Sequence, residues 1–259
     1  MMLDPLILTT LQNELAQEPI PCLFLALSGA HTYGFPSADS DYDVRGCHIL
    51  SLENALSLNK GPETKESTKS IPWQENSSLL LDLVTYDIET FLRLLLKKNG
   101  NMLENVFSSM VLFALPEFEE LKALAQGCMT RYHAYHYLGM AKTQWKLFEK
   151  NKEVKKLLYA FRALLTGCYL LENAEIETNL QTLATTYHFP FLHDLIQLKQ
   201  TGQEKELLMA EGPLYLENYT HLTERLEQMI EVSVLPPQAT TASELSQFLI
   251  QLRLEYRES

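Results

Sequence analysis

The sequence lacks the features that define several common classes of protein. Its four cysteines are widely separated and form no CxxC pair and no cluster with histidine, which argues against a structural zinc site. We expect free, buried thiols in a reducing compartment. No apolar run approaches the roughly 20 residues that a membrane-spanning helix needs, and the N-terminus has no basic segment or cleavage site typical of a signal peptide. We therefore expect a cytoplasmic protein with no membrane partner.

Positive charge is also scarce. The chain has 259 residues, with 21 Lys and Arg against 33 Asp and Glu, which gives a formal net charge of −12. Such a surface argues against broad, sequence-independent binding of nucleic acid, which depends on neutralising phosphates, but it leaves room for a local basic groove. It also suits a protein that gathers carboxylates around a divalent metal. The 46% of hydrophobic residues is typical of a globular protein with one large domain or two modest ones.

The first part of the chain alternates short apolar runs with polar turns. Helical spacing of apolar residues predicts a helix over 4–17. The runs at 20–28, 44–50 and 78–86 predict three strands. Residues 58–77 are polar and irregular, and we predict a solvent-exposed loop there.

From about residue 87 the periodicity becomes helical. Residues 87–99 and 101–108 predict two helices, and after residue 115 only helices are expected: 116–126, 128–149, 152–173, 189–199, 214–232 and 241–257. This change predicts an α+β protein with a domain at 1–115, built on a small mixed β-sheet with flanking helices. An all-helical domain would follow at 116–259.

The segment most informative about chemistry is 27–46, LSGAHTYGFPSADSDYDVRG. An apolar strand runs into Gly29, and a turn with a short helix leads to Asp41 and Asp43 at the start of the next strand. Side chains two residues apart in a strand share a face, so these two carboxylates should project together. They repel each other unless a cation lies between them, and oxygen ligands of this kind suit Mg²⁺. Gly29 would let the backbone approach a phosphate closely, with the amides that follow holding it.

A third carboxylate, Asp82, stands alone between leucines in the predicted strand 78–86. A bare carboxylate in a buried strand is costly without a partner, so we expect it beside Asp41 and Asp43. In a two-metal site one ion activates the attacking hydroxyl and the other stabilises the leaving group. Asp82 would lie nearest the hydroxyl, as a ligand or as a general base. An Asp-x-Asp pair after a glycine turn also arises by chance in many loops, and the preceding strand together with Asp82 favours the catalytic interpretation.

At this point the sequence resembles the polymerase-β-like nucleotidyltransferases, and in particular the group assigned to RNA repair. The likeness lies in Tyr-Gly followed by Ser-Asp-x-Asp-x-Arg-Gly in 27–46, and it continues through LDLVTYDIETFLRLLLKKNGNMLE (81–104) and KKLLYAFRALLTG (155–167). The resemblance implies that Gly29 lies under the triphosphate of an NTP substrate and that the three aspartates hold two Mg²⁺ ions. It also implies that Asn99 and Glu104 either have a structural role or support the residues that contact the ligands.

The sequence differs from the family pattern in the loop after Gly29, which would bind the phosphates. Ala30 stands where the family has a serine, and the loss of one phosphate-binding hydroxyl should weaken nucleotide binding by about 1–3 kcal/mol. Backbone amides could still hold the phosphates, and His31 in the same loop is a further candidate for contact with them. This departure puts nucleotide choice and efficiency in doubt more than the class of reaction.

In the predicted helix 152–173, Lys155, Tyr159 and Arg162 are spaced to share one face. By the resemblance, this face would line a cleft between the two domains and contact the triphosphate. The alternative is the solvated face of an amphipathic helix.

Together these features predict an enzyme that transfers NMP from an NTP to an acceptor hydroxyl and releases pyrophosphate. The acceptor stays open: an RNA 3′ end, a protein side chain or a small molecule all fit. A different class is also open, because Ala30 would suit a nucleotide-binding or interaction protein whose catalysis has weakened. The preferred nucleotide and the oligomeric state are not indicated by the sequence.

Overall fold

The computed structural model describes residues 3–74, 77–201 and 212–257. The chain forms two compact units, and neither is continuous in sequence. Unit 1 takes the segments 1–29, 41–128 and 239–259, and unit 2 takes 30–40 and 129–238. The predicted division into 1–115 and 116–259 differs from these units in three places. A short segment after Gly29 joins the helices of unit 2, residues 116–128 stay with unit 1, and the last helix also joins unit 1.

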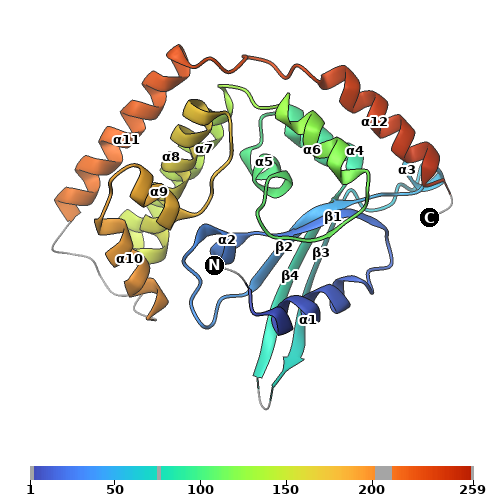
Figure 1. Cartoon of the computed structure of the whole chain (residues 1–259), viewed down its shortest axis with the longest axis horizontal. Helices are drawn as coiled ribbons and strands as arrows, with labels where there is room; N and C mark the ends of the chain where they lie inside the picture. The colour runs from blue at the N-terminus through green and yellow to red at the C-terminus, as the bar shows by residue number, and fades with distance from the viewer. Residues whose placement is uncertain (1–2, 75–76, 202–211, 258–259) are drawn as a thin grey trace. The chain divides into compact units, whose positions relative to one another are not determined.

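Unit 1 is built on a mixed five-stranded sheet, which confirms the expected α+β class (Figure 1). Its strand order is β3-β4-β2-β1-β5, with β2 and β4 parallel and the other pairs antiparallel. The strands are β1 (Cys22–Leu27), β2 (Tyr42–His48), β3 (Thr64–Trp73), β4 (Ser77–Asp87) and β5 (Val111–Ala114).

One face of the sheet packs on α1 (Pro5–Leu15), whose first turn is capped by the Asp4 carboxylate. Leu25, Val44 and Leu83 point into the core on this side and are almost fully buried. Because side chains alternate along a strand, the residues between them face the other way. The carboxylates discussed below lie on that other face.

The second face of the sheet is covered by short helices. Phe24 of β1 stacks on Phe118 with ring centroids 4.5 Å apart and meets the edge of Phe91 at 5.5 Å. The helices of unit 1 beyond α1 are α3 (Leu52–Leu56), α4 (Ile88–Leu96), α5 (Gly100–Val106), α6 (Phe118–Gln126) and α12 (Ala242–Glu255). Asn99 caps α5 by accepting a hydrogen bond from Asn101 N at 3.0 Å.

The last helix, α12, is tied to unit 1 by a buried ion pair. Arg253 is 6% exposed and Asp87 is 4% exposed. The Arg253 guanidinium donates to the Asp87 carboxylate and to the carbonyl of Leu50. Asp87 also accepts the backbone N–H groups of Leu50 and Glu89, so it joins the segment before α3, the start of α4 and α12.

The prediction of a solvent-exposed loop at 58–77 is confirmed for 58–63 and is wrong for 64–73, while residues 75–76 lie outside the described residues. Residues Thr64–Trp73 form β3, which pairs antiparallel with β4 along its whole length. β3 ends the sheet on one side, so one of its edges pairs with no described strand, and Ile71 is its only buried residue. An edge strand of this kind needs few apolar residues and therefore gives little sequence signal. The short strand β5 at the opposite edge was not expected either.

Unit 2 is helical and is built around α8, which contacts α7, α9, α10 and α11. Most of α8 is buried. The helices are α7 (His133–Asn151), α8 (Val154–Asn173), α9 (Leu180–Thr186), α10 (Phe191–Gln200) and α11 (Gly212–Val232). The six helices predicted after residue 115 are confirmed as α6, α7, α8, α10, α11 and α12, while α9 was not expected. Within the described ranges, no helix is long and apolar enough to cross a bilayer.

Candidate functional site

Two of the three predicted carboxylates are direct neighbours across the sheet. Asp43 on β2 is paired in parallel register with Asp82 on β4. Both lie on the face opposite α1, and their side chains are 26% and 31% exposed. The expectation that Asp82 lies in a buried strand environment needs correction: the flanking Leu81 and Leu83 point into the core, while Asp82 alternates to the half-exposed face. The strands therefore bring the two carboxylates together without burying them completely.

A guanidinium bridges these carboxylates. Arg45 Nη2 donates to Asp43 Oδ1 and to Asp82 Oδ2, both at 2.8 Å. Its Nη1 donates to the carbonyls of Asp82 at 2.8 Å and Val44 at 3.0 Å. The sequence analysis missed this residue. The available signal was its position two residues after Asp43 in a strand, which puts both side chains on one face.

Asp41 lies one residue before β2 and is exposed. Burial raises the pKa of the Asp43 carboxyl, Arg45 lowers it, and the charges of Asp41 and Asp82 raise it further. The charges of Asp41 and Asp82 therefore both act on Asp43. Arg45 is the cation that offsets the repulsion between Asp43 and Asp82.

Gly29 ends the connection from β1 and lies directly against Asp43. Its φ of +67° is in the left-handed region that favours glycine, and a Cβ at this position would lie 1.9 Å from Asp43 Oδ2. Ser28 N donates to the carbonyl of Asp43 at 2.8 Å, which holds the turn against β2. The close approach that requires glycine here is thus to a carboxylate, where the sequence analysis expected a phosphate.

The remaining predicted phosphate-binding residues belong to unit 2. Ala30 and His31 lie in α2 (Gly29–Tyr33), which starts the segment 30–40. This segment is anchored among the helices: Gln181 Nε2 donates to the Gly34 carbonyl at 2.7 Å, and Lys199 Nζ donates to Ser37 Oγ at 3.0 Å. The loop that follows Gly29 is thus held by α9 and α10.

The predicted stripe on α8 meets the same segment. Tyr159 packs edge-on against Tyr33 with ring centroids 5.6 Å apart, and the Arg162 guanidinium lies 3.9 Å from the centre of the Tyr33 ring. Arg162 is fully buried, while Lys155 and Tyr159 are half-buried. The stripe is therefore not a solvated face. Its middle and end hold the segment 30–40, and Lys155 is the member with the most freedom to meet a ligand.

The comparisons with known proteins give the family of the chain. A family model described as "RNA repair pathway DNA polymerase beta family" matches residues 3–251. The chain belongs to this family. Two curated relatives align with part of this chain. They are the uncharacterized protein MJ0002 of Methanocaldococcus jannaschii, 34% identical over 161 residues, and the uncharacterized protein YcgL of Bacillus subtilis, 31% identical over 157 residues.

These alignments cover 61% and 59% of this chain, and they span 63% and 57% of the relatives' own lengths. A solved nucleotidyltransferase-like protein from Exiguobacterium sibiricum is 14% identical, with a TM-score of 0.31, over 95% of this chain and 78% of its own. The chain spans less than two thirds of the length of MJ0002 and of YcgL.

The donor set of unit 1 fits a divalent metal by its chemistry. Asp41, Asp43 and Asp82 supply only oxygen, which Mg²⁺ prefers. Among the described residues, however, no three His, Cys, Asp or Glu side chains are arranged to hold a metal. Arg45 uses one oxygen of Asp43 and one of Asp82, so a metal that needs those oxygens would have to displace it. Asp43 Oδ2, beside Gly29, is the oxygen that Arg45 leaves unused.

Proposed function

We propose that this protein is a divalent-metal-dependent nucleotidyltransferase that transfers NMP from an NTP to an acceptor hydroxyl, with Asp41, Asp43 and Asp82 as its catalytic carboxylates. The main support is the parallel pairing of Asp43 with Asp82, which brings two carboxylates to one point of the sheet. The charge of Asp41 acts on the same point. Membership of the family supplies the class of reaction.

The reaction forms a bond between the acceptor oxygen and the α-phosphorus, and it breaks the bond from the α-phosphorus to the pyrophosphate oxygen. The acceptor hydroxyl gives up its proton, and the proposed acceptor of that proton is Asp82, on the half-exposed face of the sheet. Two Mg²⁺ ions held by the three carboxylates would supply the positive charge that favours the attacking oxygen and the leaving pyrophosphate. The protein contributes mainly positioning and electrostatic stabilisation, as phosphoryl transfer generally requires.

For the NTP, the proposed contacts come from the loop that follows Gly29 and from α8. The backbone amides of Ala30 and His31 are the candidates for the phosphates, with Lys155 as the cation. Arg162 is buried against Tyr33, so we assign it the role of holding the loop. Ala30 has no hydroxyl to offer, and this favours a second candidate: a nucleotide-binding protein on the same fold with weak catalysis.

An RNA 3′ end is the proposed acceptor, since the matched family is described as one of RNA repair. Protein and small-molecule hydroxyls are the other arms of the test. Labelled ATP, GTP, CTP and UTP are incubated with Mg²⁺ and each class of acceptor. We expect label transfer by the wild type and its loss in Asp43→Asn combined with Asp82→Asn. Asp194→Asn, an exposed carboxylate on α10, is the matched control.

Transfer that survives the double substitution would show that these carboxylates are not the site. Binding of NTP without transfer to any acceptor would favour the weakened binding protein. Absence of both NTP binding and transfer would overturn the proposed function.

A further inference from the structure

α7 carries a glycine that nothing in the described structure requires. Gly139 lies in the interior of the helix and is exposed, and its φ is not in the left-handed region. A Cβ added there would meet no atom within 4 Å. Glycine is among the least favourable residues in a helix interior, so alanine would be the better residue for stability. The absence of a side chain at this point therefore calls for an explanation outside the packing of the chain.

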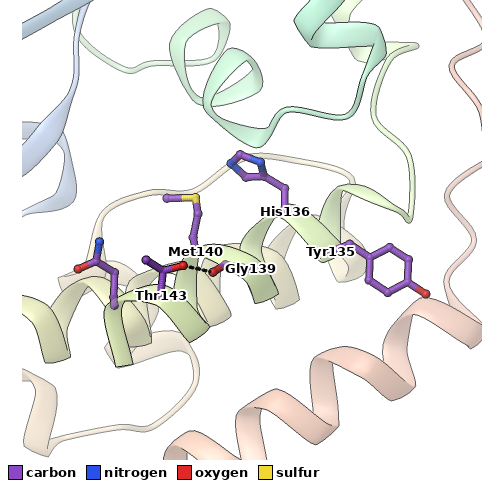
Figure 2. Close-up of a pocket in the computed structure, with 6 residues that line it drawn as sticks. Tyr135, His136, Gly139, Met140 and Thr143 are labelled. Carbon is purple, nitrogen blue, oxygen red and sulfur yellow. Dashed lines mark hydrogen bonds between the residues drawn. The ribbon is translucent and has the colours of Figure 1, made fainter. Parts of the chain in front are cut away.

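Gly139 forms the floor of a depression of about 440 Å³. Tyr135 and Thr143 are four residues before and after it, in one row along α7. His136, Met140 and Gln144 form the next row. Figure 2 shows His136 and Met140 extending from one side of the helix and Tyr135 from another, with Gly139 between them. The two rows leave a groove between them, and the missing side chain deepens it.

The walls of the depression offer both flat and polar groups. Tyr135 is 55% exposed, and its ring stacks on that of Tyr132 with centroids 5.8 Å apart, which leaves the opposite face of the ring for a ligand. Among the described residues, none makes a hydrogen bond to Gln144 Oε1, although this oxygen is buried. Thr143 is already engaged, because its hydroxyl donates to the Gly139 carbonyl at 2.9 Å. Gln144 Oε1 therefore lacks a hydrogen-bond donor within the described structure. If the amide rotates so that this oxygen faces the depression, an N–H of a ligand could donate to it.

The helix is also basic in an acidic protein. α7 contains Lys142, Lys146 and Lys150 against one acidic residue, Glu149, while the whole chain carries −12. Lys142 and Lys146 are exposed, and they lie three and seven residues after Gly139, next to the row of Tyr135. A planar group over Gly139 would thus have cations at its side.

We propose that this depression on α7 binds an unpaired nucleotide, with its base over Gly139 beside Tyr135 and its phosphate near Lys142 and Lys146. A base supplies the flat face that fits a helix without a side chain, and the N–H groups that the Gln144 amide needs. An apolar partner helix would leave this amide and the lysines without ligands. The proposal deepens the proposed function, on which its biological meaning rests, because it assigns a subsite to a nucleotide.

The test measures binding without catalysis. Fluorescence anisotropy follows a labelled single-stranded RNA oligonucleotide in EDTA, with unlabelled mononucleotides and a blunt duplex as competitors. Gly139→Leu places an apolar side chain in the depression, and its Cβ would meet no atom within 4 Å. We expect its affinity to fall by about tenfold or more, as for the loss of one stacked base, with a Tm at or above that of the wild type. Ser246→Leu, at an exposed position of α12, is the control for an added surface leucine.

Substitution of Lys142 and Lys146 by glutamine should reduce the slope of log affinity against log salt concentration by the amount expected for roughly two lost phosphate contacts. Competition by free mononucleotides would identify the NTP as the source of the bound base, and competition by single strands alone would identify the acceptor. No binding by the wild type, or binding unchanged in Gly139→Leu, would overturn the inference. If binding behaves as expected but no label is transferred in the activity assay, the proposed function fails and the subsite stands.

Discussion

Replacing Arg45 by methionine tests whether its guanidinium offsets the repulsion between the Asp43 and Asp82 carboxylates. Arg45 Nη2 is 2.8 Å from one oxygen of each aspartate, so those two oxygens are at most twice that distance, about 5.6 Å, apart. Two like charges at this separation repel by roughly 1–3 kcal/mol for effective dielectric constants between 80 and 20. Because the Asp43 and Asp82 side chains are about a quarter to a third exposed, we expect solvent to screen part of this repulsion.

Without a divalent metal, Arg45→Met should therefore lower the free energy of unfolding by about 1–2 kcal/mol, which corresponds to roughly 2–4 °C in Tm for each kcal/mol. The matched control is Arg93→Met. Arg93 pairs with Glu89 on the surface of α4 with its side chain 70% exposed, so its loss should cost under about 1 kcal/mol.

Addition of Mg²⁺ separates two arrangements of the site. If the metal needs the oxygens that Arg45 occupies, it competes with the guanidinium, and Mg²⁺ should raise the Tm of Arg45→Met more than that of the wild type. Thermal unfolding with a Mg²⁺ titration measures both effects. An equal rise in Tm with Mg²⁺ in the two proteins would show that the metal does not compete with Arg45. A Tm of Arg45→Met equal to that of the wild type without metal would show that Arg45 does not offset the carboxylate repulsion.

Three further predictions concern unit 1. Gly29→Ala combines a φ of +67° with a Cβ 1.9 Å from Asp43 Oδ2, so it should destabilise by more than about 1 kcal/mol and abolish nucleotidyl transfer; an active, equally stable variant would contradict this geometry. Arg253→Met leaves the buried Asp87 carboxylate without its cation and should lower the free energy of unfolding in urea by about 3–5 kcal/mol. Adding Asp87→Ala to this variant should cost much less than Asp87→Ala costs in the wild type, and equal costs would contradict the pairing. Burial lowers the pKa of His48 from 6.5, so its contribution to stability is present above pH 6.5 and is lost as the pH falls below that value; His48→Gln should flatten this part of the pH profile, and an unchanged profile would exclude it.

The sequence predicted those features whose cause is local. Asp82 stood out because it is the polar residue in a run of leucines, and the spacing of Asp41 and Asp43 indicated a shared electrostatic site. The helices of unit 2 were found through apolar periodicity. In each case neighbouring residues in the chain carry the signal.

Features that depend on distant contacts were missed. The role of Arg45 requires the register of β2 against β4, which no local pattern specifies. β3 has a polar sequence because it is an edge strand, and it is a strand only because β4 pairs with it. Gly139 was passed over for a related reason: an exposed helical glycine becomes informative only when the space above it is known to be empty.

The ion pair between Arg253 and Asp87 has a consequence for the order of synthesis. Asp87 leaves the ribosome long before Arg253, and at about 5–20 residues per second the interval is at least several seconds. During that time the carboxylate that joins the segment before α3 to the start of α4 has no guanidinium from α12, so unit 1 cannot reach its final state while unit 2 is being made. A chain that ends at residue 115 or 128 would lack α12, and its Asp87 carboxylate would stay without the Arg253 guanidinium. Expression of the sheet unit by itself therefore requires α12 to be added back, either in trans or through a short linker that replaces residues 129–238.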